Sequence, residues 1–134
     1  MAEITKLTAV AFTALLVVLF ALLAPAPTHA YDGTFVFYAC NTQKTSPGTP
    51  LYNAIVATIG DLEQQTPYYS YDYKNAESSS GVSAYGRGTC KYALSDCNAC
   101  LTSVGKLILS TCGNAVGARY QVTDCFIQYE STAF

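Results

Sequence analysis

Histidine is almost absent from this sequence of 134 residues, because His29 is the only one. A serine or cysteine nucleophile of the usual kind takes its general base from an imidazole. A mixed zinc site also needs histidine beside cysteine. Since His29 lies in a segment that, as argued below, is expected to be removed, hydrolases of these types and zinc sites of this kind are nearly excluded.

Positive charge is also scarce. The chain has 7 basic and 9 acidic side chains, a formal net charge of -2, and its basic residues form no stripe. Binding to nucleic acid or to an anionic membrane therefore has little support.

Two carboxylates are all that a glycosidase needs, but the acidic residues here are dispersed on polar stretches, where solvated surface acids are the simpler interpretation. We expect a binding protein, not an enzyme, and no cofactor.

The first thirty residues are typical of a secretory signal peptide. Lys6 precedes an apolar run over residues 7–23, and Ala30 supplies the small residue that a signal peptidase requires. We expect residues 1–30 to be removed and residues 31–134 to form a single secreted, extracellular domain without a membrane span. An uncleaved anchor helix is the alternative, although the apolar run is near the short end of what crosses a bilayer.

All six cysteines follow this leader, at Cys40, Cys90, Cys97, Cys100, Cys112 and Cys125. An even number of cysteines in a small exported chain favours disulfides. A zinc site of four cysteines would leave two thiols over in an oxidising compartment, and a redox pair formed by Cys97 and Cys100 would not follow a thioredoxin-like strand. We expect three bridges and no metal, with fifteen pairings open.

Two segments have the apolar period of a buried helix. The first begins at Pro50, with Thr49 as its cap, and ends before Pro67. The second is capped by Ser95 and closes at Gly113. The apolar stripes consist of Leu51, Ile55, Ile59 and Leu62 in the first helix, and of Cys97, Cys100, Leu101, Val104, Leu107 and Ile108 in the second.

The remaining segments are typical of strands. Aromatic and β-branched residues are frequent in residues 34–40, 85–94 and 117–130, and residues 69–73 place tyrosine at every second position. The polar residues 75–86 indicate a loop. Together these segments predict an α+β domain with two helices packed on an antiparallel sheet.

Five stretches of the sequence also resemble a known family. They read "ACNTQK", "YDYK", "AYGRGTCK", "SDCNACL" and "GARYQVTDCFIQYE", and they are similar to the ginkbilobin-like antifungal seed proteins of the plant gnk-homologous cysteine-rich domain family. The resemblance covers nearly all of residues 31–134. It implies a five-stranded sheet and disulfides that pair Cys40 with Cys112, Cys90 with Cys97, and Cys100 with Cys125. One departure is "KYALSD", six residues where the family has eight.

The resemblance implies mannose binding by three residues, Asn41, Arg119 and Glu130. Taken alone, Asn41 suits a turn, and Arg119 and Glu130 suit a surface ion pair. In one straight strand, Arg119 and Glu130 would be about 35 Å apart, so the chain must reverse between them. A tight turn at Asp124 and Cys125 would place these two residues opposite one another.

We therefore expect a secreted lectin that binds D-mannose and fungal cell-wall mannan and that acts in antifungal defence. Its oligomeric state is left open. The alternative is a non-enzymatic protein-protein interaction or inhibitor module that uses a tyrosine-rich surface formed by Tyr69, Tyr71 and Tyr73. Core packing is the competing interpretation of these tyrosines, so their solvent exposure decides between the two.

Overall fold

The computed structural model describes residues 2–23 and 30–134. The apolar leader forms helix α1, Ala2–Leu23, and the part of the expected signal peptide at residues 24–29 lies outside the described residues. The described chain has three α-helices and not the two that we predicted, because the leader is helical as well. Within the same residues, no helix combines the length and the apolar character required to cross a membrane.

Helix α2, Pro50–Gln65, begins and ends where the sequence predicts. The Thr49 side chain accepts a hydrogen bond from the backbone N–H of Tyr52 at 3.2 Å, which satisfies one of the free donors of the first turn. A short 3-10 turn, Thr66–Tyr68, follows. Three members of the predicted stripe, Ile55, Ile59 and Leu62, are buried against the rest of the domain.

With Ser95 as the predicted cap, the second helix would begin at Asp96. Helix α3, Cys97–Cys112, begins one residue later. Asp96, not Ser95, precedes the helix, and its side chain makes no capping hydrogen bond. The bridge between Cys90 and Cys97 holds the first residue of the helix beside the end of the preceding strand, so covalent geometry sets the start. Gly113 ends the helix with a φ of 58°, as a glycine at this position readily does.

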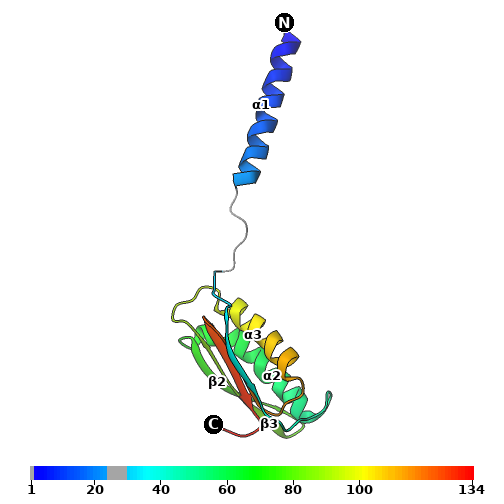
Figure 1. Cartoon of the computed structure of the whole chain (residues 1–134), viewed down its shortest axis with the longest axis vertical. Helices are drawn as coiled ribbons and strands as arrows, with labels where there is room; N and C mark the ends of the chain where they lie inside the picture. Colours follow the sequence, from blue (N-terminus) through cyan, green and yellow to red (C-terminus); the bar gives the residue numbers. More distant parts are fainter. Residues whose placement is uncertain (1, 24–29) are drawn as a thin grey trace.

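Five strands form one antiparallel sheet with the order β1-β4-β5-β3-β2. They are β1 (Phe35–Cys40), β2 (Asp72–Ser79), β3 (Val82–Cys90), β4 (Ala118–Val122) and β5 (Cys125–Glu130). Figure 1 shows α2 and α3 running side by side along this sheet. The prediction of an antiparallel sheet with helices packed on it is confirmed, and the implied count of five strands is correct.

The two faces of the sheet differ in burial. Along β5, Ile127 and Tyr129 are fully buried on the face that packs against the helices, whereas Gln128 and Glu130 on the opposite face are only partly buried. In the described part of the chain, no helix covers this second face, which we call the open face. The open face is therefore where a polar ligand can reach the sheet.

Three disulfides tie the layers together. Cys40–Cys112 joins β1 to α3, Cys90–Cys97 joins the end of β3 to the start of α3, and Cys100–Cys125 joins α3 to β5. These are the pairings that the resemblance implied, and the shortened segment "KYALSD" still allows its bridge to form. Because the first turn of α3 is linked to two strands, through Cys97 and Cys100, and its last residue, Cys112, to a third, the helix is fixed against the sheet at both ends.

The predicted polar loop at residues 75–86 is wrong. Most of it forms the hairpin of β2 and β3, which turns at Ser80 and Gly81 with φ values of 48° and 78°. Such a pair of positive φ angles is the geometry of a tight two-residue hairpin. The residues are polar because β2 is an edge strand whose side chains are alternately exposed and half-buried, not because they lack regular structure.

Glu63 of α2 lies against α3, where a Cβ atom at Gly105 would overlap its carboxylate. Burial raises the pKa of Glu63 from 4.5 to about 7, and the positive charge of Lys106 opposes this rise. The folded protein therefore binds more protons than the unfolded chain between these two values. The free energy of unfolding should fall as the pH rises through this window.

We expect Glu63→Gln to remove this pH dependence. The variant should match the wild type near pH 4, where the carboxyl is protonated in both states, and exceed its stability at pH 8 by about 1 kcal/mol, a value reduced for solvent screening because Glu63 is only half-buried. Urea unfolding at both pH values measures the difference. An unchanged slope of stability against pH in the variant would show that Glu63 does not cause it.

Candidate functional site

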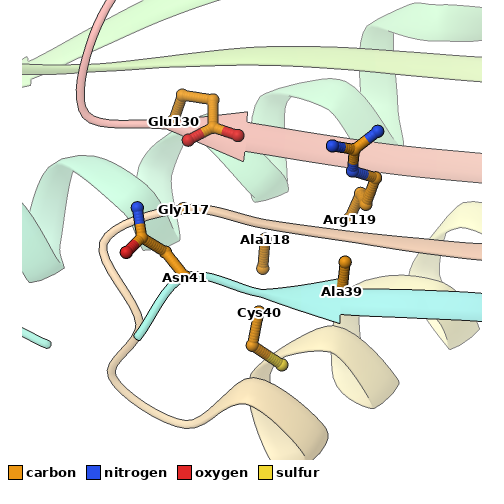
Figure 2. A pocket seen from close by; sticks show the side chains of 7 residues that line it. All are labelled: Ala39, Cys40, Asn41, Gly117, Ala118, Arg119 and Glu130. Carbon is orange, nitrogen blue, oxygen red and sulfur yellow. The ribbon is translucent and has the colours of Figure 1, made fainter. Parts of the chain in front are cut away.

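A pocket opens at one end of the open face, where β1, β4 and β5 come together. Its volume is about 220 Å³, and it is lined by Ala39, Cys40, Asn41, Gly117, Ala118, Arg119 and Glu130. All three residues of the predicted site belong to this lining. Figure 2 shows the side chains of Arg119 and Glu130 on the same side of the strands. Asn41 lies just after the end of β1, and the side chain of Cys40 is directed toward α3.

Asn41 reaches the pocket because of the strand before it. β1 pairs with β4 so that Ala39 lies opposite Arg119, and the backbone N–H of Asn41 donates to the carbonyl of Gly117 at 2.8 Å. The bridge from Cys40 to Cys112 fixes the end of β1 to α3. Asn41 is thus held beside β4 by a backbone hydrogen bond and a neighbouring disulfide.

The hairpin of β4 and β5 brings Arg119 and Glu130 together, but in a register that differs from the prediction. The turn lies at residues 123–124, one residue earlier than expected, because Cys125 is already a buried strand residue. Arg119 therefore pairs with Gln128, and Glu130 follows two residues later on the same face. The two side chains are diagonal neighbours and not direct opposites, which leaves space between them for a ligand.

Glu130 lies directly over the backbone at Gly117. A Cβ atom at this glycine would overlap the carboxylate, so no other residue fits without moving it. Gln128 Nε2 donates to Glu130 Oε1 across 3.5 Å. The lack of a side chain at Gly117 and the weak contact from Gln128 together set the position of the carboxylate.

Tyr129 stabilises the loop that leads to Gly117. Its phenol is fully buried and donates to the carbonyl of Ala115 at 3.0 Å. Burial, with a smaller contribution from the charge of Glu130, raises the pKa of Tyr129 to about 12. The phenol therefore remains protonated and keeps this hydrogen bond over the physiological range of pH.

Arg119 and Glu130 do not form the surface ion pair that would be the simplest explanation of these two residues. Among the described residues, the only salt bridge joins Arg87 and Asp72 at 2.8 Å. The Asn41 side chain does have its expected turn role, because its Oδ1 accepts from the N–H of Gln43 at 2.9 Å. In the described chain the Arg119 guanidinium and the Nδ2 group of Asn41 have no hydrogen-bond partner, so both can bind a ligand.

The three tyrosines of the alternative surface are not one exposed row. Ser70 and Tyr71 have φ angles of 56° and 62°, and β2 begins only at Asp72, so the predicted strand over residues 69–73 is largely a turn. Tyr69 is 55% exposed and stacks on Tyr73, while Tyr71 and Tyr73 pack against the core. Of the three tyrosines that the proposed protein-protein interaction surface requires, Tyr69 is thus the exposed one.

The fold and the pocket define a class of protein: a small, disulfide-linked α+β domain that presents a polar pocket at the edge of an open sheet. The family model described as salt stress response/antifungal (Stress-antifung) matches residues 39–132. The chain belongs to this family, and the resemblance noted from its motifs is confirmed.

Relatives of known name support this membership. The chain is 48% identical over 111 residues to the antifungal protein ginkbilobin-2 of Ginkgo biloba. The aligned region covers 80% of this chain and 83% of the relative. It is 46% identical over 121 residues to antifungal protein ginkbilobin-like protein 1 of Picea sitchensis, covering 87% and 91%. Both relatives are named as antifungal proteins, so the chain is a member of an antifungal protein family.

A solved structure shows the same fold. The tandem DUF26 ectodomain of the Arabidopsis thaliana cysteine-rich receptor-like protein PDLP8 superposes with a TM-score of 0.64 at 23% identity. The alignment covers 77% of this chain and 51% of that structure, so this chain spans about half the length of the solved ectodomain. At this identity the similarity concerns the fold alone.

Proposed function

We propose that this protein is a secreted lectin of antifungal defence that binds D-mannose and fungal cell-wall mannan through Asn41, Arg119 and Glu130. One observation carries the proposal: three polar side chains from separate segments of the chain line the same pocket. The antifungal names of the relatives support the defence role.

The chemistry of the pocket suits a sugar. A hexose exchanges hydrogen bonds with water for equally good ones in its site, so it needs donors and acceptors that are already oriented. Arg119 donates to sugar oxygens, Glu130 accepts from hydroxyl groups, and Nδ2 of Asn41 adds a second donor. The Ala39 side chain, on the same face as Arg119, adds a small apolar contact at the floor.

Affinity for a single sugar should be weak. Each hydrogen bond replaces one made to water, and the pocket offers little apolar surface to bury. Binding to a fungal wall would then depend on the many equivalent sugars of mannan, which raise the effective concentration around the protein. Millimolar affinity corresponds to about 4 kcal/mol of binding free energy.

The proposal also includes export. Residues 1–30 are proposed to be a signal peptide and residues 31–134 the secreted domain. The apolar helix α1 and the six cysteines, all of which form disulfides, support this division, because disulfides persist in oxidising compartments. N-terminal sequencing of the exported protein should find Tyr31 first, and a product that retains α1 would contradict the division.

Titration of the secreted protein with D-mannose, followed by NMR, tests the binding function. The backbone amide signals of Asn41, Arg119 and Glu130 should shift in a saturable way, while those of residues 102–111 on α3 should stay in place. D-galactose serves as the control sugar, with a smaller effect at equal concentration. If up to about 50 mM D-mannose and soluble mannan both leave the pocket signals unchanged, the lectin assignment is wrong.

A further inference from the structure

The open face continues beyond the pocket, and Tyr85 lies next to it. Tyr85 of β3 pairs directly with Glu130 of β5, and Arg87 pairs with Gln128. We propose that Tyr85 and Gln128 form a second subsite, which binds the next hexose residue of the same saccharide chain. This proposal rests on the function proposed above and specifies its ligand as an oligosaccharide.

The alternation of β3 places the Tyr85 ring on the same face as the pocket. Its neighbours Ala84 and Gly86 are buried on the helix side, so Tyr85 points to the open face, as Glu130 does. Directly paired residues of antiparallel strands have Cβ atoms about 4.5–5.5 Å apart. The ring therefore stands beside the carboxylate that is proposed to hold the first sugar.

Tyr85 has the properties of a sugar platform. It is half-buried, and in the described chain none of the aromatic pairs includes it, so no other ring covers its face. A pyranose has an apolar face of C–H groups and a rim of hydroxyl groups. A tyrosine ring can bury the former while its own hydroxyl group reaches the latter.

Gln128 supplies hydrogen bonds next to this ring. It lies between Arg119 and Arg87 in one row across the strands. Arg87 is occupied, because its Nε and one terminal nitrogen donate to both oxygens of Asp72 at 2.9 and 2.8 Å. Among the described residues, the side chain of Gln128 makes one hydrogen bond, its long contact with Glu130, so its amide remains the group best placed to bind hydroxyls here.

The dimensions fit two adjacent sugars. Neighbouring strands lie about 4.8 Å apart, so about 10 Å separate β4, which carries Arg119, from β3, which carries Tyr85. At the far side, Phe134 of the C-terminal segment lies against Lys74 of β2, with Nζ 5.7 Å from the ring centre. The part of the open face between Arg119 and Tyr85 therefore suits a short saccharide segment that crosses the strands.

The test compares D-mannose, mannobiose and mannotriose by calorimetry or NMR. For the wild type we expect mannobiose to bind at least about fivefold tighter than D-mannose. Tyr85→Ala should abolish this gain and leave the affinity for D-mannose within about twofold. Tyr85→Phe retains the ring and should keep the gain. Tyr92→Ala removes an 83% exposed tyrosine from the loop after β3 and is the matched control.

The signals of the wild type give a readout that does not depend on the stability of any variant. Mannobiose should shift the ring signals of Tyr85, which D-mannose should leave in place. It should also shift the side-chain amide of Gln128 further than D-mannose does, because this amide already contacts Glu130 of the pocket. If the pocket responds but these two residues do not, or if mannobiose binds no tighter than D-mannose, the second subsite is wrong and the first remains. If no sugar of the series moves the pocket signals, both assignments are rejected.

Discussion

Replacing Cys40 and Cys112 together by alanine is expected to lower the free energy of unfolding by about 4 kcal/mol. The bridge spans a sequence separation of 72 residues, the longest of the three. A cross-link restricts the unfolded chain more when it closes a longer loop. Since small domains are stable by only about 5–15 kcal/mol, the variant should lose a large part of its stability. Chemical denaturation followed by circular dichroism measures the change.

The bridge between Cys90 and Cys97 provides the matched control. It spans a separation of 7 residues, for which the same treatment gives about 2.4 kcal/mol. Cys97 and Cys112 are each 1% exposed, so the cavities left by the two double variants are similar. Equal losses of stability in the two double variants would contradict an explanation based on loop length and would assign the effect to local packing.

The elements with a buried stripe could be predicted from the sequence. Thr49, Pro50 and the apolar period of α2 define a helix by local chemistry alone, and the structure agrees. The hairpin of β2 and β3 could not, because its side chains are polar in the manner of a loop. Its stability comes from pairing with the rest of the sheet and from contacts such as Asn75 Nδ2 with Asp61 at 3.0 Å, which are not local in sequence.

The candidate site shows a similar division. The motifs shared with the family identify Asn41, Arg119 and Glu130 as candidate site residues. That these three side chains line one pocket depends on strand register and on the bridge at Cys40. The turn between β4 and β5 lies one residue earlier than expected, since a buried Cys125 fixes where the strand begins, and the partner of Arg119 is therefore Gln128 and not Glu130. Gly117 was missed because its role is to leave room for a side chain of a later strand. Gln128 was missed as well, although its position two residues before Glu130 on the same strand face was a usable signal.

Glu130→Gln is expected to weaken D-mannose binding by at least about tenfold. The substitution keeps the shape of the side chain and removes its charge. A hydrogen bond to a charged acceptor contributes about 1.5–3 kcal/mol, and the amide of glutamine replaces one acceptor oxygen with a donor. Calorimetric titration measures the affinity, and thermal unfolding shows whether the fold is retained. Wild-type affinity in Glu130→Gln would exclude the carboxylate as a sugar ligand.

Gly117→Ala tests the position of the same carboxylate without changing its charge. The added Cβ would overlap Glu130 and force its carboxylate away from the pocket, whereas the backbone of Gly117 needs no positive φ. We therefore expect a folded variant whose D-mannose affinity falls by about three- to tenfold. Gly60→Ala on α2 is the control, since a Cβ there meets nothing within 4 Å. An unchanged affinity in Gly117→Ala would mean that sugar binding does not require the carboxylate to lie over this glycine.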